Sequence, residues 1–432
     1  MTAQDTLYRP KTAWTIAGLL ATMMLVNFLD KVVIGLVAVP MMRDLDLTPA
    51  EFGLIGGSLH WLFAMAAVAG GFLANHKPTR TLLLIMAAFW SVIQLPMLLA
   101  TSVWAIIACR VLLGIGEGPA SPIATHALYK WFPDNKRSLP VALLHSGSSL
   151  GLLVAGLMIP WVTLHWGWRA NFAVLAVLGF VWCLAWLKFG EEGRLDQARA
   201  SQLPTSSERL PYRRLLSDRT VLSNYFCHFA ANWSLALTLT WVPTYLEVGL
   251  GIDSLNTGRL FALFVVVTTP LSLIMAWWSQ DLMRRGFSSR LARCVFVSIS
   301  LIISGLLAFA QTMPDIPVAA RVTLMTLSGG FALVMYSVGP AILGEITPSS
   351  QRGSILAMGN GFASIAGLSA PVVTGLLVQN ATGHVASGYE QGFMVTGAIL
   401  IVSGLLGLLY MNPARSQSTL GTGDSAAVAT AT

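Results

Sequence analysis

Stretches of about 20 apolar residues, long enough to cross ~30 Å of hydrocarbon as a helix, recur along almost the whole of this 432-residue chain. Twelve such stretches are centred near residues 26, 63, 91, 115, 152, 178, 233, 268, 301, 331, 365 and 401. Strand-like alternation of polar and apolar residues is absent, and an open sheet would leave backbone groups unpaired in lipid. The pattern predicts an all-α membrane protein with twelve transmembrane helices.

Basic residues indicate which side of the membrane each turn faces. The chain is 55% hydrophobic and 10% charged, with a formal charge of +7. Of its 26 Lys and Arg residues, 20 fall in the two ends and the even-numbered turns of a twelve-span chain. Cytoplasmic loops carry such an excess, so we expect both termini in the cytoplasm. The charge follows topology and therefore does not indicate a nucleic-acid partner.

A polar segment divides the chain into two halves. Residues 190–219 are rich in charge and include a Pro-Thr-Ser-Ser run, which is typical of a linker. Paired six-helix halves with a site between them are a standard transporter plan. We expect a six-helix bundle over 1–189, a cytoplasmic linker over 190–219, a second six-helix bundle over 220–411 and a disordered tail over 412–432.

Two acid–base pairs lie inside predicted spans. Asp30 and Lys31 are in the first apolar stretch, and Arg110 and Glu117 are in the fourth. An ionised side chain at the centre of a membrane costs roughly 2.5 to 3.5 kcal/mol on insertion scales, so such groups usually face water and carry function. Arg110, Gly114 and Glu117 share one helical face, with the two charges about 10 Å apart along the axis. Each charge therefore needs water, a ligand or a partner on another helix.

These four side chains suggest a proton-coupling device. A nearby cation favours the charged form of a carboxyl group, whereas desolvation opposes it. A substrate carboxylate that pairs with Lys31 or Arg110 would free Asp30 or Glu117 to hold a proton, and the charge-compensated site could then change its access. The alternative is a permanent ion-pair network that only fixes the first and fourth helices.

The residues around these charges resemble the major facilitator superfamily, and within it the anion:cation symporter branch of sugar-acid and aromatic-acid permeases and vesicular organic-anion carriers. The similarity covers residues 12–411. Its strongest parts are NFLDK at 27–31, RVLLGIGEGP at 110–119, GWR at 167–169, WVPTYL at 241–246 and GN at 359–360. The resemblance implies the major facilitator fold of two six-helix bundles, transport by alternating access and a monomeric carrier.

The resemblance also assigns roles to residues. Asp30 and Glu117 would carry protons, Arg110 would be the fourth-span arginine, and Asn360 would contact the substrate. Lys31 stands where many bacterial members have arginine. A point charge there replaces a bidentate fork, so a carboxylate should be held with less fixed geometry.

Aromatic residues near the second span indicate the kind of acid. Phe28 and Phe63, the latter shortly after Trp61, stand where sugar-acid carriers often have tyrosines. The loss of hydroxyl groups makes a polyol acid a poorer ligand and favours a more apolar carboxylate. We include all three aromatic residues among the expected substrate contacts.

The gating signature of the superfamily is incomplete in the first half. After the second span it is reduced to Asn75, His76 and Pro78, whereas the second-half copy retains Asp281. This change puts the usual salt bridge of the first half in doubt. The expected gating residues are Asn75, Arg80, Asp281 and Arg285.

Other polar residues within the spans are more simply explained as hydrogen-bonded packing residues. Two of them, His145 and Tyr336, are also candidates for the substrate cavity. The four cysteines lie in different spans without metal-ligand spacing, so we expect no disulfide and no metal site. The polar span residues are His60, Gln94, His126, His145, Ser148, Ser149, Asn224, His228, Asn232, Tyr336 and Ser337.

The sequence predicts a proton-coupled symporter that imports a small organic anion across a bacterial inner membrane. A proton-coupled drug exporter of the same fold is the alternative. That branch tends to carry a Gly-Pro signature on the fifth span, whereas the stretch Gly147–Gly151 is followed by no proline until Pro160. A receptor or scaffold would not need acids and bases in two spans. No phosphate-cradling loop, nucleophile elbow or cofactor motif is found, so we expect neither an enzyme nor a cofactor.

Overall fold

The computed structural model describes residues 9–133, 136–193, 195, 210–348 and 351–421. Within these ranges every regular element is a helix, and the predicted all-α fold is confirmed. The chain forms two compact units. Unit 1 contains Met1–Thr205 and Leu239–Val265, and unit 2 contains Ser206–Thr238 and Val266–Thr432.

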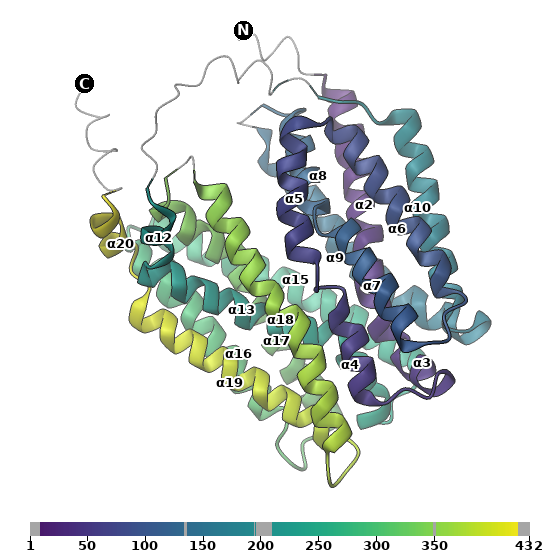
Figure 1. Cartoon of the computed structure of the whole chain (residues 1–432). Helices are drawn as coiled ribbons and strands as arrows, with labels where there is room; N and C mark the ends of the chain where they lie inside the picture. Colours follow the sequence, from purple (N-terminus) through teal and green to yellow (C-terminus); the bar gives the residue numbers. More distant parts are fainter. Residues whose placement is uncertain (1–8, 134–135, 194, 196–209, 349–350, 422–432) are drawn as a thin grey trace, which may run out of the picture. The chain divides into compact units, whose positions relative to one another are not determined.

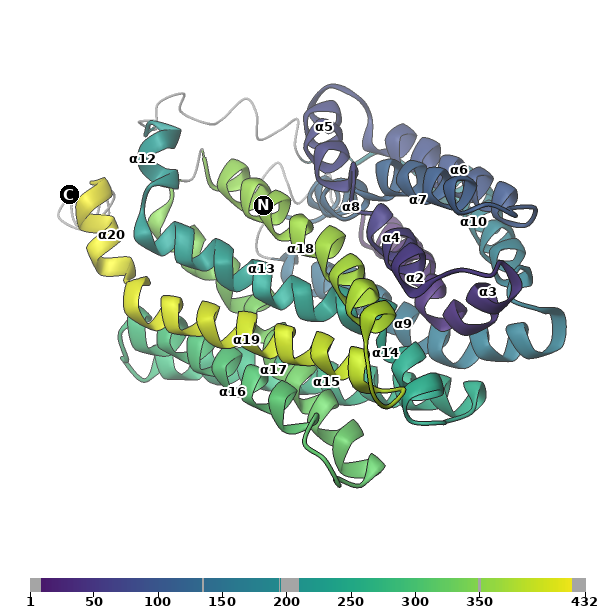
Figure 2. The ribbon, with the colours of Figure 1, turned by 60° about the horizontal axis from the view of Figure 1, so that its bottom comes forward.

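Small residues bring the helices of unit 1 together. Gly147 and Gly151 of α9 face the backbone of Ala21 and Leu25 in α2, and a Cβ atom at either glycine would overlap a carbonyl oxygen. Membrane helices associate through such close contacts because lipid leaves little hydrophobic driving force between them. Figures 1 and 2 both show α2 and α9 side by side. The helices of the amino-terminal part of this unit are α2 (Pro10–Leu36), α3 (Ala38–Asp44), α4 (Pro49–Ser58), α5 (Phe63–His76), α6 (Thr79–Met97), α7 (Val103–Glu117), α8 (Ala120–Tyr129), α9 (Ser138–Trp166) and α10 (Ala170–Phe189).

The second and fourth spans of unit 1 are both interrupted. α4 ends at Ser58 and α5 begins at Phe63, and Figure 1 draws them as separate helices. α7 ends at Glu117 and α8 begins at Ala120. Pro119 accounts for this second break, because proline has no N–H and its ring clashes with the preceding helical turn. The ring fits against α5 at Gly70, where a Cβ atom would overlap it.

The α9–α10 turn is fastened to α3. Gly167 has a φ of +81°, a conformation that side chains with a Cβ rarely adopt. It directs Trp168 and Arg169 toward Asp44, which accepts a 3.1 Å hydrogen bond from the Trp168 indole and pairs with Arg169. Hydrogen bonds from Arg169 and Trp168 lower the pKa of Asp44. Polar contacts thus add to the packing of the buried Trp168 and Phe172 rings at this end of unit 1.

Unit 2 uses the same close packing. Gly305 of α16 and Gly397 of α19 face each other's backbone, and Figure 2 shows these two helices alongside one another. α13 and α15 are each shared between the units. The remaining helices of the chain are α12 (Tyr212–Leu216), α13 (Arg219–Thr240), α14 (Val242–Thr244), the π-helix η2 (Tyr245–Gly249), α15 (Ser254–Arg284), the π-helix η3 (Arg290–Val295), α16 (Phe296–Ala310), α17 (Val318–Ile346), α18 (Arg352–Asn380), α19 (Ser387–Tyr410) and α20 (Pro413–Leu420).

Eleven spans in the described ranges are long and apolar enough to cross a membrane. The twelfth expected span coincides with α13, whose Asn224, His228 and Asn232 lower its hydropathy. Two of the expected non-helical segments contain helices. α12 falls within the linker expected over 190–219, and α20 falls within the tail expected from residue 412. The rest of that tail, 422–432, lies outside the described residues.

Candidate functional site

The four charged residues singled out from the sequence all belong to unit 1. Asp30 and Lys31 come from the carboxyl-terminal third of α2, and Arg110 and Glu117 come from α7. Asp30, Arg110 and Glu117 are 1%, 3% and 1% exposed, whereas Lys31 is half-buried. Three ionisable groups are therefore enclosed within one bundle of helices. We call these residues, together with Asn27, His60 and Gln94, the charged cluster.

The carboxylates of the charged cluster lack hydrogen bonds. Arg110 donates from Nη1 to the backbone carbonyl of Asp30 at 3.3 Å, rather than to its side chain. Both carboxylate oxygens of Asp30 and both of Glu117 are buried without a hydrogen-bond partner among the described residues. Arg110 and Lys31 are close enough to act on both carboxyl groups electrostatically. A permanent ion-pair network would satisfy these oxygens by direct contact, so this arrangement instead leaves room for a proton or a ligand.

Lys31 lies against two aromatic rings. Its Nζ atom is 4.4 Å from the centre of the Phe28 ring and 5.2 Å from that of Phe63. A cation–π contact is worth about 0.5–1 kcal/mol at an exposed site and about 2 kcal/mol when desolvated, and the half-buried Lys31 lies between these cases. Phe63 reaches the lysine because α5 begins there, directly after the interruption of the second span. Trp61 lies within that interruption and is 41% exposed.

Two carboxamides lie beside the two carboxyl groups. Asn27 of α2 interacts with Glu117, and Gln94 of α6 interacts with Asp30. Neither was assigned a functional role from the sequence, which placed Gln94 among the packing residues. Asn27 could have been found because it precedes Asp30 by three residues and therefore shares its helical face. For Gln94 the only signal was an amide within an apolar span.

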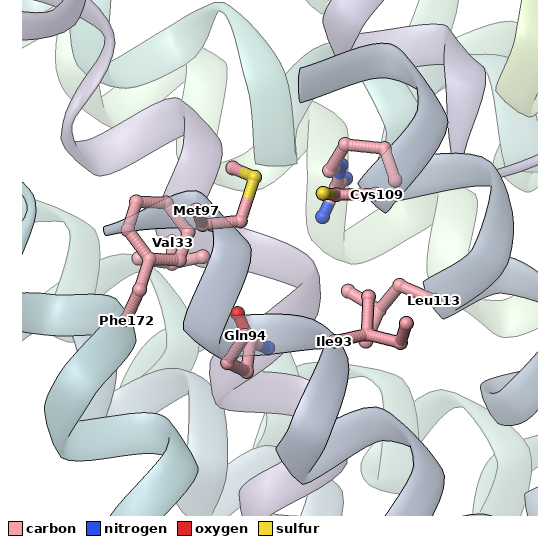
Figure 3. A pocket seen from close by; sticks show the side chains of 8 residues that line it. Val33, Ile93, Gln94, Met97, Cys109, Leu113 and Phe172 are labelled. Carbon is pink, nitrogen blue, oxygen red and sulfur yellow. The ribbon is translucent and has the colours of Figure 1, made fainter. Parts of the chain in front are cut away.

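Gln94 and Arg110 also line a small cavity, which Figure 3 shows from close by. Its volume is about 10 Å³, close to the room that one water molecule needs. Nε2 of Gln94 and Nε of Arg110 are both buried without a hydrogen-bond partner in the described structure. The rest of the lining is mostly apolar and consists of Val33, Ile93, Met97, Cys109, Leu113 and Phe172.

Glycines hold α7 against the interrupted second span. A Cβ atom at Gly114 would overlap the carbonyl oxygen of Leu59, and one at Gly118 would overlap that of Phe63. The interruption between α4 and α5 therefore lies directly against the helix that carries Arg110 and Glu117. Broken helices at the centre of a membrane are tolerated where they line a polar cavity, and transporters build binding sites from them.

Two of the three remaining substrate candidates lie in unit 2. Tyr336 of α17 donates a 2.9 Å hydrogen bond to Asn232, whose amide donates at 2.7 Å to the Ala363 carbonyl. His228 packs edge-on against the same tyrosine, with ring centres 5.2 Å apart. Asn360 is exposed on α18. The third candidate, His145, is exposed on α9 of unit 1. Within the described structure the charged cluster comes from α2, α6, α7 and the α4–α5 turn, and α9 contributes no residue to it.

Unit 2 also contains a larger cavity of about 330 Å³. Its charged lining residue, Arg293, pairs with Glu345 at 2.9 Å, so this cavity offers a charge that is already compensated. None of the substrate contacts expected from the sequence lines it. The other lining residues are Leu273, Ala276, Trp277, Ser279, Gln280, Ser337, Val338 and Ala341.

The expected gating residues fall at helix ends. Asp281 and Arg285 form an ion pair of 2.6 Å along one helix end in unit 2. Arg80 is the second residue of α6 in unit 1, where its side chain donates to the Leu187 carbonyl at 3.3 Å. Asn75 is near the end of α5, but its side chain lies outside the described structure. The structure places these residues without testing whether they gate transport.

Glu192 provides a polar contact of unit 1 that the sequence did not reveal. Its carboxylate accepts hydrogen bonds from the backbone N–H groups of Thr79 and Arg80, at 3.1 and 2.7 Å, and from the Lys130 ammonium at 2.6 Å. Burial alone would raise the pKa of Glu192, but the Lys130 ammonium and these N–H groups together lower it. An anion at the start of α6 is also favoured by the helix dipole.

The fold and the charged cluster define a multi-pass helical membrane protein of the secondary-transporter class. A family model described as the Major Facilitator Superfamily matches residues 20–291. The match covers more than half of the chain, and the chain belongs to this superfamily of transporters. The resemblance inferred from the sequence is thereby confirmed, and the protein is a carrier rather than an enzyme.

Two relatives are similar over nearly their whole lengths. The chain is 26% identical over 401 residues to the hexuronate transporter of Bacillus subtilis, covering 90% of this chain and 92% of that protein. It is 28% identical over 424 residues to the probable sulfoacetate transporter SauU of Cupriavidus necator, covering 94% and 95%. A crystal structure of a bacterial homologue of the human lysosomal transporter Spinster, inward-facing and unoccupied, matches with a TM-score of 0.76 at 16% identity, covering 96% of this chain and 98% of that one. This last similarity supports the fold.

Proposed function

We propose that this protein imports a small organic anion together with protons by alternating access. The observation that carries the proposal is the pair of buried carboxyl groups, Asp30 and Glu117, whose oxygens have no hydrogen-bond partner in the described structure. A bare carboxylate in such a place is costly. A proton on the carboxyl group, or movement of a cation toward it, removes that cost.

The cations of the cluster supply the substrate site. Lys31 contacts aromatic rings and Arg110 contacts a backbone carbonyl, so neither is committed to a carboxylate. An incoming organic anion pairs with one of them and withdraws the cation from Asp30 or Glu117. That carboxyl group then takes up a proton. The loaded cluster then has the same net charge as the empty one. No extra charge is therefore buried when the site changes from facing one side of the membrane to facing the other.

The aromatic rings beside the Lys31 ammonium group suggest the class of substrate. Phe28 and Phe63 offer faces to an apolar or aromatic body rather than hydroxyl groups to a polyol. The two relatives are named a hexuronate transporter and a probable sulfoacetate transporter, and both of these named ligands are small organic anions. We propose a monocarboxylate with an apolar or aromatic body, taken up across a bacterial inner membrane by a monomeric carrier with both termini in the cytoplasm.

Transport by the purified protein in liposomes tests this function. The panel comprises benzoates, aldonates, uronates and dicarboxylates, with an imposed pH gradient that is acidic outside, and with sodium either present or replaced by choline. We expect a benzoate-like monocarboxylate to accumulate in the absence of sodium, and an ionophore that collapses the pH gradient to abolish accumulation. Accumulation driven by sodium alone, or extrusion of cationic drugs without organic-anion uptake, would contradict the proposal.

A further inference from the structure

The Gln94 side chain occupies an unusual position for a residue of the third span. It is 2% exposed, and it is the group of α6 that interacts with the Asp30 carboxyl. Its Nε2 atom nonetheless has no completed hydrogen bond among the described residues. A buried amide without partners loses about 1–3 kcal/mol relative to a satisfied one. The position therefore calls for a partner that the protein side chains do not supply.

The cavity beside Gln94 has the properties of a site for one water molecule. Gln94 and Arg110 each present an unpartnered buried N–H group, and both line the same space of about 10 Å³. Figure 3 shows Gln94 at this pocket, with the other labelled side chains around it. A water oxygen there can accept both hydrogen bonds, and Arg110, which lines the cavity, also donates to the Asp30 backbone carbonyl at 3.3 Å. Two to four polar partners in a space of this size are what a buried water requires.

We propose that Gln94 and one water molecule, held between Gln94 and Arg110, position the carboxyl group of Asp30 and stabilise it in both protonation states. This inference rests on the proposed function, in which Asp30 carries a proton. An amide suits the task because its N–H donates to the charged carboxylate and its oxygen accepts from the protonated one. It does so without gaining or losing a proton itself. Gln94 is thus a positioning residue rather than a proton carrier.

Other charged groups also face Asp30, so several groups influence its protonation. Lys31 acts from the same helix, and Arg110 and Glu117 act from α7. His60, from the turn between α4 and α5, faces Arg110 and Lys31. Gln94 is the contribution of α6 to this set. A change at Gln94 therefore isolates the effect of a neutral hydrogen-bonding partner, since all of these charges remain.

Infrared spectroscopy of the liposome-embedded protein tests the proposal without any transport substrate. The carbonyl stretch of protonated Asp30 is followed as pH is varied and is assigned by its loss in Asp30→Asn. Gln94→Met has nearly the same shape but cannot donate to the carboxylate. We expect its titration midpoint to lie about one pH unit above that of the unaltered protein, because the variant has no amide N–H to donate to the charged form. Ile93→Met, on the same helix and lining the same cavity, serves as the matched control and should leave the midpoint unchanged.

The outcomes separate this inference from the proposed function. An unchanged midpoint in Gln94→Met, or an equal shift in Ile93→Met, overturns the role of Gln94. A second measurement uses the unaltered protein, so it does not depend on whether a variant folds: the O–H stretch of the buried water, recognised by its shift in H₂¹⁸O, should change as Asp30 titrates. Absence of that band overturns the water site. If Asp30 titrates as expected but uptake ignores the pH gradient, the proposed function fails while the role of Gln94 stands.

Discussion

Two groups of buried polar residues, one in each unit, differ in how well their hydrogen-bonding atoms are satisfied. In unit 2, Tyr336 bonds to Asn232, Asn232 to the Ala363 carbonyl, and Asn224 to the Gly339 carbonyl, at 2.9, 2.7 and 3.1 Å. In unit 1, the carboxylates of Asp30 and Glu117 have no hydrogen bond within the described structure. One unit holds a neutral network whose partners are all protein groups, and the other holds charges that lack them.

This difference in hydrogen bonding indicates in which unit a proton or an anion can change the stability of the protein. A satisfied neutral network rigidifies its surroundings and responds little to pH. An unsatisfied charged cluster is costly at rest and gains stability when a proton, a water molecule or an anion arrives. We therefore expect substitutions in unit 1 to uncouple transport, and equivalent removals of a polar atom in unit 2 to have modest effects.

The largest effect is expected from Glu117→Gln. An amide cannot exchange a proton, so accumulation driven by the pH gradient should fall from about tenfold per pH unit and per proton to none. Exchange of labelled for unlabelled substrate needs no net proton movement and should continue. Uptake and exchange in liposomes measure both. Glu192→Gln, which alters a fully hydrogen-bonded carboxylate of the same unit, is the control and should accumulate substrate normally.

Removing the charge of Lys31 comes next. Lys31→Gln retains length and hydrogen bonding but loses the attraction for a carboxylate, which is worth about 1.5–3 kcal/mol for a charged partner. The KM for substrate should therefore rise by roughly one to two orders of magnitude. Initial uptake rates over a range of substrate concentrations give this value. A KM close to that of the unaltered protein would place the substrate carboxylate elsewhere.

A pair of glycine substitutions compares packing in the two units. The Cβ atom of Gly114→Ala would overlap the rigid Leu59 backbone, whereas that of Gly339→Ala would meet the flexible end of Met335. We expect the first variant to be less stable by about 1–3 kcal/mol and the second to lose much less, because a methionine can move aside. Thermal unfolding in detergent ranks them. Equal losses would show that the backbone near the charged cluster adapts freely.

A smaller effect is expected from Tyr336→Phe in unit 2. The change removes the hydrogen bond to Asn232, at a net cost of about 0.5–1.5 kcal/mol. Uptake should stay within a few-fold of normal, and its pH dependence should not change. The pH profile of uptake checks this directly. A displaced profile would mean that unit 2 also takes part in proton coupling, and the contrast between the units would fail.

The smallest effect is expected for Glu192, the hydrogen-bonded glutamate of unit 1, and it concerns the stability of the protein in acid. The pKa of Glu192 is lowered in the folded protein, so its contribution to stability is complete above the ordinary glutamate range and is lost as pH falls through the lowered value. Melting temperatures should show a loss of about 2 °C in acid that is absent in Glu192→Gln. The same acid sensitivity in both proteins would assign it to other groups.

The sequence predicted the helical fold and the charged cluster for the same physical reason. Ionised groups are rare in lipid, so Asp30, Lys31, Arg110 and Glu117 stand out within apolar stretches that themselves specify the spans. The proximity of Lys31 to Phe63 could be expected only from the superfamily resemblance. It depends on the break between α4 and α5. Apolar residues continue across this break, so the sequence pattern does not reveal it.

Other features left no periodic signal in the sequence. Gln94 belongs to a helix whose hydropathy requires no polar partner, and its role depends on which residue of another helix it meets. Glu192 lies in a segment whose composition indicates only a linker, yet its position at the start of α6 gives it four donors. Likewise, a serine-rich sequence predicted no structure for 413–420, whereas Asn412 caps α20 there.

The resting place of Lys31 has a consequence for selectivity. The two aromatic rings replace part of the hydration shell of the Lys31 ammonium group. Most of the remaining desolvation cost of binding therefore comes from the arriving anion. The desolvation cost on entry is largest for strongly hydrated ions such as sulfate and smallest for acids with an apolar body. We therefore expect sulfate to be a weak competitor of organic-acid uptake.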